Sequence, residues 1–250
     1  MNTNPKSIQL VVLDIDGVLT DGESQPLDLA MIQLLAGMNE AAQRDSNLPA
    51  VTLCSGRPAP YVEALLQAIA GHLPGIYENG AGLFVPHPYG FHQHPQLADK
   101  KGFQEVRDRL QSELVKNRMA FVQPGKVHSL TLFAEDPSKT SLLRKQAEDA
   151  LGTLVEKVEL TYSTSCLNVL PRGMDKGKGL EFLAETLDLG LEDMLGVGDS
   201  DVDLPFLAII GHSAAPANAN AGVKQLVDYV SVEATSQGLH DILQHYGLLA

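Results

Sequence analysis

The sequence predicts an α/β fold in which a parallel sheet carries an inserted module. Short apolar runs recur at residues 10–13, 50–54 and 194–198, and stretches with helical spacing of apolar residues separate them. Proline-rich joints near residues 86–95 and at Pro171 enclose a segment with a different rhythm of elements. We therefore expect a Rossmann-like, doubly wound core of residues 1–85 and 165–250, with a small α/β module of residues 86–164 inserted into it.

The composition is that of a folded protein without a basic surface. The 250 residues are 44% hydrophobic, and the formal net charge of -13 argues against a nucleic-acid partner, since phosphate backbones require a basic face. No apolar run approaches the ~18 residues that span a bilayer. Cys54 and Cys166 lie in apolar runs and offer no spacing for a zinc site or a disulfide framework. We expect a soluble cytoplasmic protein that binds no membrane, while its oligomeric state is left open.

Two aspartates follow the first apolar run. In an open α/β sheet, ligands bind at the carboxyl ends of the strands, where Asp14 and Asp16 fall. Asp14 can attack an electrophile and Asp16 can hold and deliver a proton, provided that a divalent cation such as Mg²⁺ offsets the repulsion between them. Gly17 then permits a tight turn beside a phosphate. The alternative is an ordinary turn with two solvated aspartates.

A hydroxyl, a glycine and a cation follow the second apolar run. Ser55 and Gly56 can offer a hydroxyl and an amide to a phosphate oxygen, although Ser55 alone is also a common helix cap. Further along, Lys176 and Lys178 open a helix, where the dipole disfavours a cation unless an anion is shared. Lys176 is the better candidate because it lies nearer the preceding strand.

Three acids, Asp199, Asp201 and Asp203, follow the run at residues 194–198. They would repel one another without a cation, so a hard divalent metal is expected here, shared with the aspartates of the first strand. Asp201 has the simpler interpretation of a helix cap. Histidines 87, 92 and 94 lie around a predicted hairpin at residues 82–94, and solvation is favoured for them because no cysteine or carboxylate stands at ligand spacing.

The order of these motifs resembles the haloacid dehalogenase superfamily. An aspartate pair, a serine, a lysine and a Gly198-Asp199-Ser200 loop, each at a strand end or helix start, form the four-motif arrangement of that superfamily over nearly the whole chain. The position of the insertion, after Asn79-Gly80, resembles that in the Cof-like subfamily IIB, whose members have a cap domain after the third strand. The run from Asp175-Lys176-Gly177 to Gly198-Asp199-Ser200 and the closing residues 242–248 are most similar to archaeal-type phosphoglycolate phosphatases and related sugar-phosphate phosphatases, including sucrose-phosphate phosphatase.

The resemblance implies a Mg²⁺-dependent phosphomonoesterase acting on a small phosphorylated metabolite. Asp14 would become an aspartyl-phosphate, and Asp16 would act as general acid and base and bind Mg²⁺ through its backbone carbonyl. The implied site also comprises Ser55, Gly56 and Lys176 at the phosphate, Arg57, Asn79 and Asn218 on the substrate side, and Asp14, Asp16, Asp199 and Asp203 at the metal. Val202 departs from the asparagine frequent in relatives, which leaves the metal affinity open.

Two other functions remain compatible with the sequence. A sugar phosphomutase or phosphotransferase would pass the phosphoryl group to an acceptor other than water, and a non-catalytic metabolite-binding protein would keep the fold without the chemistry. The substrate is also open between phosphoglycolate, sucrose phosphate and other sugar phosphates. The inserted module offers few cations to choose among them, namely Lys100, Lys101, Arg107 and Lys126.

Overall fold

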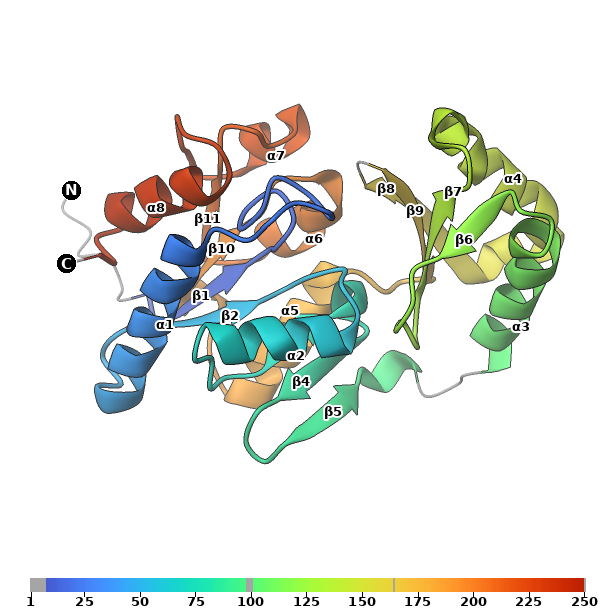
Figure 1. The fold of residues 1–250 in the computed structure, drawn as a ribbon. Coiled ribbons are helices and arrows are strands. Elements are labelled where there is room, and N and C mark those ends of the chain that lie inside the picture. Colours follow the sequence, from blue (N-terminus) through green and yellow to red (C-terminus); the bar gives the residue numbers. More distant parts are fainter. Residues whose placement is uncertain (1–7, 98–100, 164, 250) are drawn as a thin grey trace.

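A computed structural model describes residues 8–97, 101–163 and 165–249 of the chain (Figure 1). Its core is a five-stranded parallel sheet in the order β12, β11, β10, β1, β2. The strands are β1 (Leu10–Leu13), β2 (Ala50–Leu53), β10 (Met194–Val197), β11 (His212–Ala215) and β12 (Tyr229–Val230). Because β1 lies between β2 and β10, the loops that follow these three strands meet at one edge of the sheet. The predicted doubly wound α/β fold is confirmed.

Helices cover both faces of the core sheet. Val11 and Leu13 of β1 pack in one apolar cluster, whereas Leu10 and Val12 pack in another, as the two-residue period of a strand requires. The first cluster includes side chains of α1 (Leu29–Arg44), α2 (Ala59–Ala68) and α8 (Thr235–His245). The second includes side chains of α5 (Lys176–Leu187), α6 (Leu204–Leu207) and α7 (Ala221–Leu226). None of the helices in the described part of the chain is long and apolar enough to cross a membrane.

The predicted hairpin at residues 82–94 is confirmed, and it stays with the core. β4 (Gly82–Val85) pairs antiparallel with β5 (Gly90–Gln93) and with β3 (Gly75–Tyr77). One bridge between Cys54 and Ile76 places β3 beside β2. Residues 86–93 therefore do not belong to the sheet of the inserted module, although the sequence-based boundary at residue 86 assigned them to it.

The inserted module, called the cap below, has its own sheet and its own core. An antiparallel sheet in the order β6, β7, β9, β8 comprises β6 (Ala120–Val122), β7 (Leu130–Ala134), β8 (Val158–Ser163) and β9 (Cys166–Pro171). Helices α3 (Lys101–Leu110) and α4 (Leu143–Leu151) pack on one face of it through a separate apolar cluster (Figure 1). β9 lies in this sheet, whereas the expected boundary at residue 164 put it in the core. We propose boundaries near residues 101 and 171 instead.

The two-residue period of its strands gives the cap sheet two different faces. Leu132 of β7 and Val169 of β9 point into the apolar cluster beneath the helices. Thr131, Phe133 and Asn168 alternate with residues of that cluster and line a cavity on the opposite face. The cap therefore presents a partly polar surface toward the core.

Candidate active site

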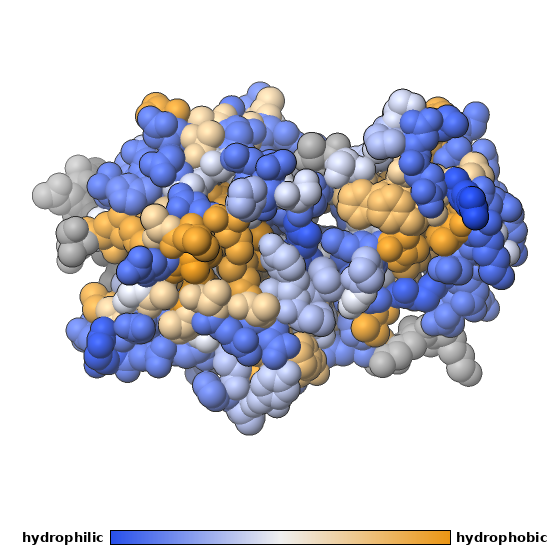
Figure 2. Space-filling model, in the orientation of Figure 1, coloured by the Kyte–Doolittle hydropathy of each residue, from blue (hydrophilic) through white to orange (hydrophobic). Residues whose placement is uncertain are grey.

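A cavity of about 340 Å³ lies between the carboxyl edge of the core sheet and the cap. Figure 2 shows the molecular surface hollowed between these two lobes. The volume is at the small end of the range for ligand pockets, about 300–1,000 Å³, and therefore suits a small metabolite. Nine of the residues expected from the sequence line it, namely Asp14, Asp16, Ser55, Gly56, Arg57, Asn79, Lys176, Asp199 and Asn218. Asp203 is fully buried behind this wall.

The two motifs most distant in the chain meet at Lys176. Asp14 follows β1 directly, and its Oδ1 lies 2.7 Å from the Lys176 Nζ at the start of α5. The same ammonium lies 2.5 Å from Oδ1 of Asp203. Lys178, by contrast, has a partly exposed side chain and pairs with Glu181 at 2.7 Å. The structure thus brings Lys176, and not Lys178, into contact with the expected nucleophile.

The site carries more negative charge than its lysine can balance. Burial, together with the carboxylates of Asp203 and Asp199, raises the pKa of Asp14 well above its usual value, although Lys176 acts in the other direction. Burial and Asp203 also raise the pKa of Asp199 to about 7. Burial alone would lower the pKa of Lys176, but Asp14 and Asp203 raise it, so the ammonium stays charged. One ammonium among three carboxylates leaves room for a second cation.

The donor set fits a hard divalent metal. Asp14, Asp199 and Asp203 each offer a carboxylate oxygen, and these oxygens lie within 4.8 Å of one another. Oδ1 of Asp199 is buried and has no hydrogen-bond partner among the described residues, which is unusual for a carboxylate unless a ligand binds it. Oδ2 of Asp203 accepts hydrogen bonds from both N–H and Oγ of Ser200 and from the Asp199 N–H. Asp203 therefore mainly orients the loop, and Asp14 and Asp199 are the residues with oxygens available to a metal.

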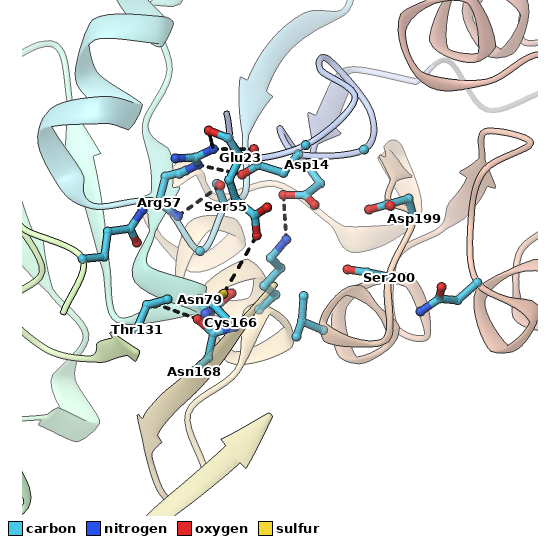
Figure 3. Close-up of a pocket in the computed structure, with 18 of the residues that line it drawn as sticks. Asp14, Glu23, Ser55, Arg57, Asn79, Thr131, Cys166, Asn168, Asp199 and Ser200 are labelled. Carbon is cyan, nitrogen blue, oxygen red and sulfur yellow. Dashed lines mark hydrogen bonds and ion pairs between the residues drawn. The ribbon is translucent and has the colours of Figure 1, made fainter. Parts of the chain in front are cut away.

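Asp16 and Arg57 form an ion pair that the sequence did not indicate. Nε of Arg57 lies 2.7 Å from Oδ2 of Asp16, and Nη2 lies 2.6 Å from Oδ1, so both carboxylate oxygens are engaged. Nη2 also donates to the carbonyl of Glu23 at 2.7 Å (Figure 3). Arg57 lines the cavity as expected, but its guanidinium is bound to the side chain of the expected general acid. The Asp16 side chain accordingly lies outside the metal-binding group.

The remaining predicted residues differ in how much hydrogen-bonding capacity they offer. Both side-chain amide atoms of Asn79 are buried and have no hydrogen-bond partner in the described part of the chain, so this residue is available to a ligand in the cavity. The Asn218 amide instead joins two loops, since it donates to the Gly17 carbonyl at 2.9 Å and accepts from the Thr235 N–H at 2.8 Å. Oγ of Ser55 accepts from the Arg57 N–H at 3.2 Å, which leaves its proton for an acceptor.

The profile of haloacid dehalogenase-like hydrolases matches residues 83–243. The chain belongs to the haloacid dehalogenase-like hydrolases. The superfamily resemblance drawn from the motifs is therefore confirmed.

Curated relatives and solved structures match this hydrolase over nearly its whole length. A phosphoglycolate phosphatase of Thermoplasma volcanium is 28% identical over 245 residues, covering 97% of this chain and all of that protein. A phosphoglycolate phosphatase of Methanobrevibacter smithii is 24% identical over 250 residues. In fold, a Thermoplasma acidophilum structure aligns with a TM-score of 0.76 at 24% identity, covering 97% of this chain and 100% of that one. A subclass IIB sugar phosphatase aligns with a TM-score of 0.69 at 19% identity, covering 96% and 100%.

Sequence reasoning missed most of the cap side of the hydrolase site. Besides Lys126, the cap residues at the cavity are Gln123, Thr131, Phe133, Cys166 and Asn168. A polar side chain inside an otherwise apolar strand, such as Thr131 or Asn168, is the signal that could have indicated them. Of the other module cations, Lys100 and the Lys101 side chain lie outside what the structure describes. The three histidines form no metal-binding group with other described residues.

Gly17 is required by the contact between the first loop and Asp199. Its φ is +92°, and a Cβ built there would lie 2.1 Å from Oδ2 of Asp199. We expect Gly17→Ala to lower metal-dependent activity by about 100-fold, because the carboxylate must move from the metal-binding group. Gly22→Ala is the matched control, since Gly22 also has a positive φ of +142° but no atom within 4 Å of the added Cβ. Equal steady-state rates for the two variants would contradict this role.

Proposed function

We propose that this hydrolase is a Mg²⁺-dependent phosphomonoesterase that cleaves a small phosphorylated metabolite, phosphoglycolate or a sugar phosphate, through an aspartyl-phosphate. The observation that carries the proposal is the convergence of Asp14, Lys176 and Asp199 at a cavity of small-molecule size. The family and the curated relatives, which are phosphoglycolate phosphatases, support a phosphatase. Both cysteines are buried thiols, which suits a reducing cytoplasmic compartment.

The reaction consists of two successive displacements at phosphorus, and residues of the core have different roles in them. Asp14 attacks phosphorus, the bond to the ester oxygen breaks, and Asp16 gives a proton to the departing alkoxide. Asp16 then takes a proton from the water that hydrolyses the aspartyl-phosphate. Lys176 and Ser55 hold the phosphoryl oxygens, and Lys176 also keeps Asp14 in line by its 2.7 Å contact. A divalent cation held by Asp14 and Asp199 would neutralise charge on the phosphoryl oxygens.

The Arg57 ion pair sets a condition for this chemistry. Both oxygens of Asp16 are bound to Arg57, so Asp16 can meet the ester oxygen only after at least one of these hydrogen bonds opens. A bound substrate offers Arg57 a substitute partner, because a guanidinium binds phosphate oxygens as readily as a carboxylate. Arg57 therefore binds Asp16 in the absence of substrate and binds the substrate once it has entered the site.

Removal of divalent metal ions tests the proposal directly. Treatment with EDTA should lower phosphate release from p-nitrophenyl phosphate by about 100-fold or more, and added Mg²⁺ should restore it. Because the pKa of Asp199 is raised to about 7, a metal ion must displace a proton at lower pH. The Mg²⁺ concentration for half-maximal rate should therefore fall as the pH rises from about 6 to about 8. A rate that is independent of metal would overturn the metal-dependent reaction.

Product analysis separates hydrolysis from the alternatives. Stoichiometric release of inorganic phosphate with no added acceptor supports the phosphomonoesterase. A phosphomutase or phosphotransferase would release phosphate slowly until a sugar phosphate or another acceptor is supplied. A metabolite-binding protein would bind the phosphorylated compound and leave it intact.

A further inference from the structure

Lys126 brings a buried cation to the cap side of the cavity. It lies in the loop between β6 and β7, is 8% exposed, and lines the cavity. Its ammonium donates to Oγ1 of Thr131, which in turn donates to Oδ1 of Asn168 at 2.7 Å. Figure 3 shows Thr131 and Asn168 side by side on the cap strands, across the cavity from Asp14. This chain of hydrogen bonds fixes the ammonium but does not neutralise it.

The cavity has three cationic side chains among the described residues, and Lys126 is the one without a carboxylate partner. Lys176 pairs with Asp14 and Asp203, and Arg57 pairs with Asp16. No ion pair to Lys126 occurs in the described ranges of the chain. A buried ammonium that lacks an anion is costly, and burial lowers the pKa of Lys126 to about 8. Such a group in a ligand cavity is best explained by an anion that the ligand supplies.

The loop that carries Lys126 is held in place by two charged side chains that are themselves engaged. The Glu78 carboxylate, from the core, accepts hydrogen bonds from the N–H groups of residues 127–129 at 2.8–2.9 Å and from Oγ of Ser129 at 2.8 Å. Nη2 of Arg107, from α3, donates to the carbonyls of Val127 and Ser129 at 3.0 and 3.1 Å. The carboxylate that acts most strongly on Lys126, that of Glu78, thus accepts its hydrogen bonds from the loop backbone and Ser129, and the loop presents Lys126 in a defined position.

We propose that Lys126, positioned by Thr131 and Asn168, binds the carboxylate of a short phosphorylated hydroxy acid whose phosphoryl group lies at Asp14. This inference rests on the proposed phosphatase function, and it selects one class from the substrates left open there. The cavity then has two anion-binding ends, one on the core and one on the cap. A phosphate ester of an uncharged sugar would leave the Lys126 ammonium desolvated and unpaired. This cost disfavours the binding of such a substrate.

The test compares two substrates of similar size that differ in the carboxylate, phosphoglycolate and ethyl phosphate. We expect the unmodified enzyme to prefer phosphoglycolate by about 100-fold in kcat/KM, and Lys126→Met to lower that ratio by about 30-fold or more. Lys139→Met is the matched control, because Lys139 is an exposed cap lysine that contacts Asp136 at 3.6 Å, and it should leave the ratio unchanged. A ratio that Lys126→Met does not alter overturns the inference, even if both rates fall.

A binding measurement keeps this test separate from the test of the chemistry. Calorimetric titration of Asp14→Asn protein with phosphoglycolate, with and without Lys126→Met, should show at least about 30-fold weaker binding in the double variant. If the unmodified protein hydrolyses neither compound, the proposed function fails, while equal affinities in the titration would overturn the Lys126 site. Affinity should also fall above about pH 8 as the ammonium loses its proton. Four other ionisable groups shift the pKa of Lys126, namely Glu78, Cys166, Asp16 and Arg57. Both titrated variants, Asp14→Asn and Asp14→Asn with Lys126→Met, retain all four.

Discussion

Asp14→Asn should lower the turnover of a phosphomonoester by about 10⁴-fold or more while the protein stays folded. The amide has the shape of the carboxylate but cannot form the aspartyl-phosphate, so the first displacement has no nucleophile. Folding should survive because burial and neighbouring carboxylates already raise the pKa of Asp14, and a neutral side chain relieves that repulsion. Steady-state phosphate release and thermal unfolding of the same preparation measure the two effects.

Asp201→Asn is the matched control for the nucleophile. Asp201 is an exposed acid of the same acidic region, and its side chain accepts a hydrogen bond from Asn220 at 3.3 Å. Its replacement removes one negative charge near the site but no group in contact with the reacting atoms. The rate of phosphate release should therefore stay within about 3-fold of that of the unmodified protein. Mg²⁺-dependent turnover retained in Asp14→Asn would rule out the covalent mechanism.

Lys176→Met should cause the largest loss of stability of any single substitution at the site. Lys176 is 1% exposed and contacts Asp14 and Asp203 at 2.7 and 2.5 Å. Removal of one partner of a buried ion pair leaves uncompensated charge and costs about 3–5 kcal/mol. For a chain of this size we expect the Tm to fall by about 10 °C, together with loss of activity. Calorimetry and phosphate release test both parts.

Lys178→Met provides the control for the lysine, two residues further along α5. Its ammonium pairs with Glu181 at the surface, where solvent screens the ion pair, so its loss should leave the Tm close to that of the unmodified protein. The double variant Asp14→Asn with Lys176→Met should be less destabilised than the sum of the singles, because one orphaned carboxylate is already gone. A loss of stability in the double variant that equals the sum of the two single losses would contradict an interaction between Asp14 and Lys176.

The destabilisation caused by Lys176→Met should depend on pH in a defined direction. A carboxyl whose folded pKa is raised destabilises the fold as it ionises, so the loss should grow as the pH rises. The pKa values of Asp14 and Asp199 are both raised in the folded protein, and that of Asp199 is raised to about 7. The difference in unfolding free energy between Lys176→Met and the unmodified protein should therefore be larger at pH 8 than at pH 5.

Local pattern was enough to predict the core elements and the acids at their ends. Apolar runs such as residues 10–13 identify buried strands, and polar residues that follow them lie at the ligand-binding edge of any parallel sheet. The cap boundaries were harder because they depend on which strand pairs with which. Residues 167–170 form an alternating run between the expected boundary at residue 164 and the joint at Pro171, and only the pairing of residues 166–171 with β7 and β8 assigns them to the cap.

By itself, the sequence determined the α/β fold, the superfamily, and the strand-end acids and lysine, because these follow from apolar periodicity and from motifs of a few residues. Only the tertiary structure decided the partners of Arg57, Glu78 and Lys126. Arg57 binds Asp16 from 41 positions away, and Glu78 binds the Val127 amide from 49 positions away. The first pairing arises where the loops after β1 and β2 meet at one edge of the core sheet, and the second arises where the cap packs on the core. Charge or hydropathy along the chain does not encode which of several neighbouring ions a side chain meets.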